Sequence, residues 1–354
     1  MTMTTALLAL AAIILVALIA HGWWSVRRVS PRQPAPERQE GRVEPGLGAA
    51  AADGPADPPA EPQAQEPAEV PPIGLPAVRM APCLDALIDA IVALAVDAPV
   101  PGEVAVAHLP ASRRAGSKPM HIEGLEAHGG QWEVPAPGRL YTEFQAGVQL
   151  ANRNGALNEI EYSEFVQKVQ GFAEGVGAMA DFPDMLEVVA RARELDEFAT
   201  PLDAQITLTL RARAVPWSVG YVVQCAARHG FVPGVLPGRL VVPSGEEGAP
   251  PVLVLGFDPQ VALADDPQAA ALREVTLSLD VPQTPRASEP YPQWYEVATA
   301  LASELEASHV DDAGRPVTLG DFDAIGRQLD QLYQALESRD LAAGSPAARR
   351  LFSG

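Results

Sequence analysis

The chain opens with an unbroken run of apolar residues. From Ala6 to Trp24 no side chain is charged, and at about 1.5 Å per residue a helix of this length crosses a hydrocarbon core of about 30 Å. Trp23 and Trp24 end the run, and Arg27 and Arg28 follow. Interfacial aromatic residues and basic residues after the span indicate that the long C-terminal part lies in the cytoplasm. The pattern therefore predicts a transmembrane anchor.

Two other structures compete with an anchor over residues 1–28. A cleaved signal peptide would need a basic residue before the apolar run and small residues at a cleavage site. Here the basic residues lie after the run. A buried core helix would show a polar face, and none is present. The anchor is therefore the favoured interpretation.

Residues 29–82 are dominated by Pro, Ala, Glu and Gln, as in ADGPADPPAEPQAQEPAEVPP at positions 52–72. With almost no aromatic or branched apolar side chains, this segment cannot bury enough surface to offset the entropy of ordering. We predict a disordered linker. As a flexible coil it would span roughly 40 Å r.m.s., so we expect it to hold the folded part well off the membrane.

After residue 200, apolar and polar residues alternate one by one. Ile206, Leu208 and Leu210 alternate with Thr207 and Thr209, which is typical of a half-buried strand. The same reading predicts, in order, a helix, the three strands of a meander, an amphipathic helix, a loop with an edge strand, and a last helix capped by Asp321. They span residues 216–229, 239–242, 251–257, 274–281, 294–305, 309–318 and 322–336.

The segment 83–200 reads as a degenerate copy of the segment 201–354. Three pairs of segments match in the same order along the chain: 88–90 with 202–204, 149–176 with 280–305, and 184–195 with 321–332. Matches in register favour a tandem duplication. The alternative is that any two strand-then-amphipathic-helix segments look alike.

Charge and cysteine content narrow the class of protein. The formal net charge is −20, and a surface this acidic repels phosphate backbones and anionic lipid, so we expect no nucleic-acid partner. Cys83 and Cys225 form no metal-ligand spacing and no disulfide framework, which fits a reducing compartment. A bridge between the two stays open.

No motif of an enzyme stands out. The chain has no Walker A loop, HExxH, CxxC or nucleophile elbow, and the glycine-containing string at residues 175–180 ends a predicted helix instead of opening one after a strand. His108, His121 and His128 lack metal-ligand spacing. We therefore predict a protein without catalytic residues, metal or cofactor.

The order of these parts resembles the ZipA family, which anchors the bacterial divisome to the membrane and binds the tubulin-like protein FtsZ. The resemblance rests on the span ending in His21-Gly22-Trp23-Trp24, the Pro/Gln/Ala linker, Gly230-Phe231, the strand at residues 275–282 and the terminal helix. It covers the anchor, the linker and about residues 202–336. The family has one folded domain, so the segment 83–200 is extra.

The resemblance implies a split β-α-β fold, with a largely antiparallel six-stranded sheet, helices on one face, and a shallow groove on the other that takes the C-terminal peptide of FtsZ. It also implies a single-pass protein of the inner membrane, located at the division septum, with its amino terminus in the periplasm and its C-terminal domain in the cytoplasm. Other divisome proteins are further expected partners. A scaffold that binds a different divisome or envelope protein is the alternative function.

The expected groove departs from the family pattern. By register its residues are Gln205, Thr207 and Thr209 on the first strand, Thr276 and Ser278 on the fourth, and Phe257 and Pro259 at the end of the third. Family members carry large apolar side chains on this face, and Ser278 stands where a phenylalanine is expected. Because buried aromatic residues dominate such interfaces, the loss predicts weakened peptide binding. An ordinary solvated sheet face is the competing interpretation.

Overall fold

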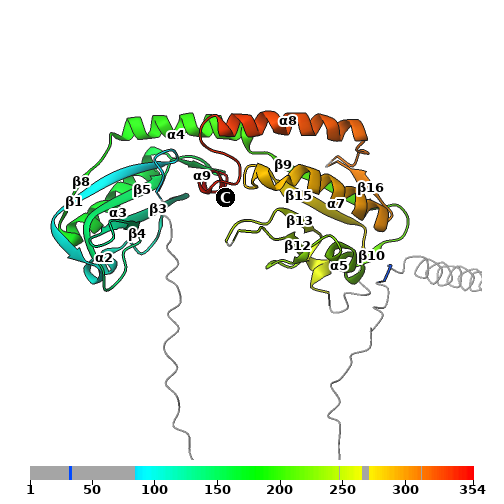
Figure 1. Cartoon of the computed structure of the whole chain (residues 1–354), viewed down its shortest axis with the longest axis horizontal. Helices are drawn as coiled ribbons and strands as arrows, with labels where there is room; N and C mark the ends of the chain where they lie inside the picture. The colour runs from blue at the N-terminus through cyan, green and yellow to red at the C-terminus, as the bar shows by residue number, and fades with distance from the viewer. Residues whose placement is uncertain (1–31, 34–83, 247, 265–270, 312) are drawn as a thin grey trace, which may run out of the picture. The chain divides into compact units, whose positions relative to one another are not determined.

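The computed structural model describes residues 32–33, 84–246, 248–264, 271–311 and 313–354 (Figure 1). The predicted anchor, with Ala6, Trp23, Trp24, Arg27 and Arg28, and nearly all of the predicted linker lie outside these residues. None of the described helices is long and apolar enough to cross a membrane. The described residues form a mixed α/β fold with antiparallel sheets and eight α-helices. We call residues 84–202 the first lobe and residues 203–354 the second lobe.

The described part of the first lobe has one antiparallel sheet with strand order β2-β3-β5-β1-β8, and β4 pairs with β3. Its strands are β1 (Asp89–Pro101), β2 (Arg114–Ala115), β3 (Lys118–Glu126), β4 (Trp132–Glu133), β5 (Leu140–Gln149) and β8 (Ala178–Asp181). A separate hairpin consists of β6 (Ala151–Asn152) and β7 (Gly155–Ala156). The helices are α2 (Gly102–His108), α3 (Glu159–Val176) and α4 (Met185–Ala199).

The second lobe has an antiparallel sheet with strand order β11-β12-β13-β15-β9-β16. Its strands are β9 (Gln205–Ala212), β11 (Val232–Pro233), β12 (Arg239–Val242), β13 (Leu253–Gly256), β15 (Glu274–Asp280) and β16 (Ala307–Val310). A small ribbon pairs β10 (Trp217–Ser218) with β14 (Ala271–Leu272). The helices are α5 (Val219–Ala227), α6 (Pro259–Ala262), α7 (Pro290–Glu304), α8 (Leu319–Glu337) and α9 (Pro346–Leu351).

The two sheets share one arrangement. In each, the first strand is β1 or β9. One of its neighbours is the last strand of the same sheet before a long helix (β5 or β15), and the other is the strand that follows that helix (β8 or β16). Figure 1 shows that long helix, α3 or α7, lying along its own sheet. The helices α4 and α8 come next in the chain. This is the order that a repeated unit requires, and common ancestry of the two lobes stays a prediction.

Alternation of apolar and polar residues decides which face of the second sheet is buried. Leu208 on β9 and Leu277 on β15 are buried, and Trp294 of α7 packs in the same core. The indole Nε1–H of Trp294 donates to the carbonyl oxygen of Leu277 at 3.5 Å. Full burial of one such leucine contributes about 1.5–3 kcal/mol. The threonines and serine between the leucines therefore lie on the opposite face.

Helices α5, α8 and α9 differ from the sequence-based expectation. Helix α5 starts at Val219, because Trp217–Ser218 pairs with β14 as a strand. Helix α8 is capped by Thr318; Asp321 is its third residue, and its Oδ2 accepts hydrogen bonds from the Thr318 N–H and hydroxyl, both at 2.7 Å. Helix α9 was not expected, because its six residues are too short to show a hydrophobic period.

Charged residues join the two lobes. Arg350 of α9 forms a bidentate ion pair with Asp89 of β1, at 2.6 and 2.8 Å. A second set of ion pairs has its arginine in the first lobe: Arg153 pairs with Asp203 at 2.6 Å and with Asp280 at 2.8 Å, both in the second lobe. The C-terminal residues of the second lobe thus contact the start of the first sheet.

Candidate functional site

The face of the second sheet opposite α7 is the candidate binding surface. Strand register arranges its side chains in two rows: Val241, Val254, Ser278 and Thr207, then Arg239, Gly256, Thr276 and Thr209. All of these residues are half-buried or exposed. The rows alternate with the buried leucines of the same strands, because successive side chains of a strand point to opposite faces. We call these eight residues the open face.

A hollow of about 780 Å³ lies at one end of the open face. Its walls combine apolar side chains with a few polar ones: Leu236, Pro237, Phe257 and Pro259, with Arg239, Asp258, Glu274 and Thr276, and with Gly238 and Gly256. Leu236 is 56% exposed. A Cβ placed on Gly256 would have only the carbonyl oxygen of Thr276, at 3.9 Å, within 4 Å. The missing side chain of Gly256 therefore leaves part of this space open.

Local turn chemistry positions Phe257 and Pro259. Gly238 has φ +74°, and a Cβ there would lie 2.5 Å from the carbonyl oxygen of Phe257, so this turn needs glycine. The Phe257 N–H donates to the carbonyl oxygen of Gly238 at 2.8 Å. Pro259 is the first residue of α6, and Asp258 caps the helix by accepting from the N–H of Gln260 at 2.8 Å. The apolar wall is thus held by main-chain contacts.

Charge is uneven around the hollow. Glu274 pairs with Arg211 at 2.6 Å. Arg239 is exposed and has no ion pair among the described residues. The open face therefore offers an apolar hollow beside one available guanidinium, which suits a partner with an apolar side chain next to an acidic group.

The seven expected groove residues lie on the open face and beyond both of its ends. Phe257, Pro259 and Thr276 line the hollow. Ser278, Thr207 and Thr209 continue the two rows across β15 and β9. Gln205 lies at the far end, where its amide donates to Asp280 at 3.2 Å, and Asp280 is paired with Arg153 of the first lobe. That end of the face is therefore engaged by the lobe junction.

Sequence reasoning missed part of the apolar surface. Val241 and Val254 supply the apolar half of one row, and Leu236 forms a wall of the hollow. Val241 and Val254 lie on strands too short to show which face is buried. Leu236 carried a usable signal, because it is a large apolar residue in a glycine- and proline-rich loop at residues 234–238, where burial is not expected.

A second concavity lies between α7 and α8 and has a volume of about 860 Å³. Aromatic residues dominate its walls, including Tyr291, Tyr295, Phe322 and Tyr333. Tyr291 stacks on Trp294 with ring centroids 5.8 Å apart, and its hydroxyl donates to the carbonyl oxygen of Phe322 at 2.5 Å. Burial raises the pKa of Tyr333 to about 12. We call this concavity the aromatic cleft.

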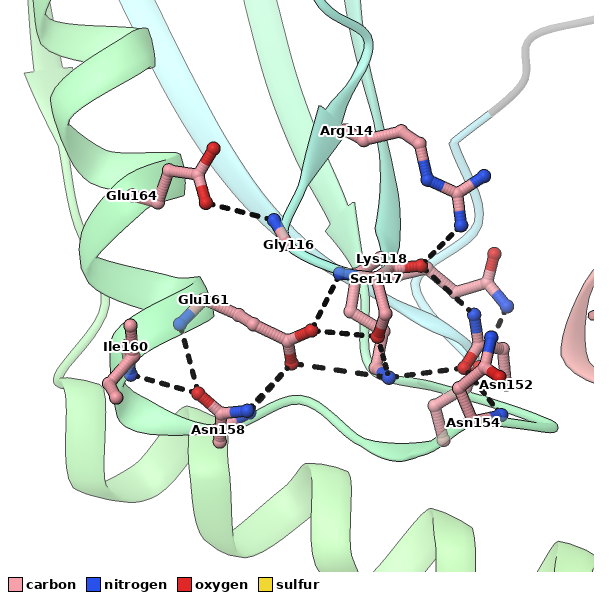
Figure 2. A network of polar contacts seen from close by, with 12 residues as sticks. Arg114, Gly116, Ser117, Lys118, Asn152, Asn154, Asn158, Ile160, Glu161 and Glu164 are labelled. Carbon is pink, nitrogen blue, oxygen red and sulfur yellow. Dashed lines mark hydrogen bonds and ion pairs between the residues drawn. The ribbon is translucent and has the colours of Figure 1, made fainter.

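The first lobe contains a buried polar network that the sequence did not reveal (Figure 2). The side chain of Lys118 is 1% exposed. Its ammonium donates to Ser117 Oγ at 2.8 Å and to Asn152 Oδ1 at 3.1 Å, and lies 4.0 Å from Glu161 Oε2. Burial lowers the pKa of Lys118.

Glu161 links this network to the start of α3. Its carboxylate accepts from the Ser117 N–H at 2.8 Å and the Ser117 hydroxyl at 2.7 Å, and from the N–H of Asn158 at 3.3 Å. Burial alone would raise the pKa of Glu161, but the hydrogen bonds from Ser117 and Asn158 outweigh it and the net pKa is lowered. The Ser117 hydroxyl donates to a carboxylate and accepts from an ammonium, so the arrangement fastens the β2–β3 turn to α3.

The histidines and cysteines do not form a metal site in the part of the chain that the structure describes. A ring nitrogen of His108 is 2.9 Å from the carbonyl oxygen of Val104, and one of His128 is 3.1 Å from Glu126 Oε1. Burial lowers the pKa of His121 and raises that of the free, buried thiol of Cys225. Cys83 lies outside the described residues.

Comparison of the chain with models of protein families gives no match, and comparison with curated proteins gives none. The choice among functions therefore depends on the sequence pattern and on the geometry of the open face.

Proposed function

We propose that the chain is a membrane-tethered adaptor of bacterial cell division, similar to ZipA, that binds the C-terminal peptide of FtsZ on the open face of the second lobe. In this role it links the FtsZ ring to the inner membrane. The observation that carries the proposal is the hollow of about 780 Å³ on the side of the second sheet opposite α7, with Leu236 exposed at its wall.

The arrangement of the sheet supports this role. The strand order β13-β15-β9-β16, with α7 between β15 and β16 in the chain, is compatible with a split β-α-β domain that keeps one face free. The first lobe repeats the order, and we propose that residues 83–200 are a degenerate second copy and residues 201–354 the functional one. The binding surface ends at Asp280, because this residue is paired with Arg153 of the first lobe.

The chemistry of the open face selects the ligand. An apolar side chain of the peptide would fill the hollow against Leu236 and Phe257, and Arg239 would pair with an acidic side chain or the terminal carboxylate. Thr207 and Ser278 add little apolar area. We therefore expect affinity to depend on the hollow and to be lower than for a groove lined by aromatic residues.

We further propose that the protein is a single-pass protein of the inner membrane, with its amino terminus in the periplasm, its lobes in the cytoplasm, and its site of action at the division septum. The charge-free run before Trp23 and Trp24 and the basic residues after it support this topology. Extraction of the full chain by carbonate, or a periplasmic reporter active at Gly354, would overturn it.

The proposal is tested by removing one wall of the hollow. Leu236→Ser deletes an exposed apolar side chain, so it should leave the fold intact and weaken binding of a labelled FtsZ C-terminal peptide. A loss of about 1.4 kcal/mol of apolar burial corresponds to about ten-fold in Kd. Fluorescence anisotropy of the peptide against the full chain measures the effect.

The matched control is Leu263→Ser. Leu263 is also exposed, at 70%, and follows α6, but it does not line the hollow. We expect the control to bind as the wild type does. Equal binding by wild type and Leu236→Ser, or absence of binding by all three proteins, would contradict the proposal.

The alternative function is a membrane-anchored scaffold that binds another divisome or envelope protein instead of FtsZ. The aromatic cleft favours it, because Tyr291, Tyr295 and Tyr333 line this concavity and tyrosine is enriched at protein interfaces. Loss of a partner other than FtsZ from pull-downs with Tyr295→Ala, but not with Leu236→Ser, would support this alternative.

A further inference from the structure

Arg32 is bound to the second lobe although it lies in the segment that the sequence assigns to the linker. It forms an isolated parallel bridge with Trp217. The Arg32 N–H donates to the carbonyl oxygen of Pro216 at 2.8 Å, and its own carbonyl oxygen accepts from the N–H of Ser218 at 2.9 Å. Because β10 already pairs with β14 on its other side, Arg32 takes the place of a third strand.

The side chain of Arg32 adds two contacts. Its Nη2 lies 2.8 Å from Glu306 Oε1, and its guanidinium lies 5.6 Å from the ring centroid of Tyr221. The hydrogen bond to Glu306 raises the pKa of Arg32. Main-chain pairing, an ion pair and a cation–π contact thus meet on one residue.

The residues that receive Arg32 have hydrogen bonds of their own to the end of α7. Trp217 is fully buried, and its Nε1–H donates to the carbonyl oxygen of Leu305 at 2.7 Å. The hydroxyl of Tyr221 donates to the carbonyl oxygen of Glu304 at 3.0 Å. Glu306 sits in the left-handed region, with φ +52°, in the turn between α7 and β16. Trp217 and Tyr221 are therefore fastened to the C-terminal end of α7 by hydrogen bonds that do not involve Arg32.

We propose that the second lobe captures the segment just after the predicted anchor through Arg32, and that this capture, not the linker, sets the distance of the lobe from the membrane. Arg32 is eight residues after Trp24, and a fully extended chain of that length spans at most about 29 Å. The stated distance to the membrane rests on the proposed membrane anchor. The capture itself rests only on the contacts of Arg32.

Limited proteolysis of the full chain in detergent tests the capture. Trypsin cleaves after arginine, and the bonds after Arg38 and Arg42 supply internal references in the same segment. We expect cleavage between Arg32 and Gln33 to be slower than at either reference, with products identified by mass spectrometry. Glu306→Gln removes the ion pair, so it should speed cleavage after Arg32 by about two- to five-fold, the range expected for one exposed ion pair.

The control is Glu296→Gln on α7. Glu296 is exposed and has no ion pair among the described residues, so its replacement should leave all three cleavage rates unchanged. Equal rates after Arg32, Arg38 and Arg42 in the wild type, or no acceleration by Glu306→Gln, would overturn the capture. The readout needs neither FtsZ nor a membrane. Failure of peptide binding therefore leaves the capture standing, and failure of the capture leaves peptide binding standing.

Discussion

At the scale of single residues, buried charges are compensated by short networks. Lys118 and Glu161 lie in the first lobe with almost no solvent exposure, and each is hydrogen-bonded on several sides. Removing one member of such a network leaves its partners with unsatisfied polar groups, which costs more than the net value of the bonds. The network therefore makes the β2–β3 turn a sensitive point of the first lobe.

The pH dependence of Glu161→Gln tests this view. The folded-state pKa of Glu161 is lowered, so its carboxylate stabilises the fold above the unfolded pKa of about 4.5, and this contribution is lost as pH falls through the folded pKa. We expect a loss of about 1.5–3 kcal/mol in the free energy of unfolding at pH 7. Urea denaturation should show a smaller difference from wild type at pH 3.5.

Glu164→Gln provides the comparison for that measurement. Glu164 lies one turn further along α3 and accepts from the Gly116 N–H at 2.9 Å, but its side chain is exposed. We expect a much smaller effect on stability at pH 7. Equal destabilisation by the two variants would mean that the buried network has no special role.

At the scale of elements, each strand of the second sheet has one buried and one open side, and Gly256 interrupts the open side. Its neighbours in the row are Arg239 on β12 and Thr276 on β15. Glycine in a strand weakens the sheet, because it has the largest backbone entropy to lose and no side chain to pack. A glycine here therefore costs stability and leaves room in the hollow.

Gly256→Val separates stability from binding. Gly256 does not have a positive φ, and a Cβ at this position would meet only the carbonyl oxygen of Thr276, at an ordinary contact distance of 3.9 Å. We expect the variant to gain about 0.5–1 kcal/mol in the free energy of unfolding, and therefore to unfold at a higher temperature. Its branched side chain should fill part of the hollow and weaken FtsZ peptide binding. Unchanged peptide affinity in a well-folded Gly256→Val protein would place the ligand elsewhere.

At the scale of the whole molecule, the lobes are joined by reciprocal ion pairs. Asp89 contributes a carboxylate whose side chain is 0% exposed, and Arg350 comes from the last helix of the chain. Phe352, two residues later, is also buried. The C-terminal segment therefore belongs to the junction and is expected to couple the stability of the two lobes.

Arg350→Ala tests this coupling. The variant leaves the buried carboxylate of Asp89 without its charged partner, which typically costs about 3–5 kcal/mol. We expect calorimetry to show a lower Tm and separation of the unfolding of the two lobes. Arg349→Ala is the control, because Arg349 pairs with an exposed Glu246 and such pairs contribute at most about 1 kcal/mol. An equal loss of stability in the two variants would show that the ion pair of Arg350 with Asp89 is not buried in solution.

The sequence predicted the elements with strong periods and missed features that depend on distant contacts. Alternation at residues 206–210 predicted strand β9, and the apolar stripe at residues 294–305 predicted helix α7. The period of the apolar residues also shows which face of each element is buried. The buried Lys118 carried no local signal, because its partner Glu161 is far along the chain. The open face was assigned from strand register, whereas the hollow needed the turn at Gly238, which brings Leu236 beside Phe257.

The central claim, that the open face binds the FtsZ C-terminal peptide, is tested most directly by restoring apolar area at Ser278. Ser278→Phe would add a side chain between Val254 and Thr207, next to the row that reaches the hollow. Burying 60–100 Å² more, at about 25 cal/mol per Å², corresponds to roughly 1.5–2.5 kcal/mol, or about ten- to seventy-fold in affinity before ordering costs.

The measurement is a titration of labelled FtsZ peptide by fluorescence anisotropy against wild type, Ser278→Phe and Ser308→Phe. Ser308 lies on β16, opposite Arg211 and away from the hollow, so its variant adds the same side chain outside the site. We expect tighter binding by Ser278→Phe alone. Tight wild-type binding that Ser278→Phe leaves unchanged or weakens would contradict the account.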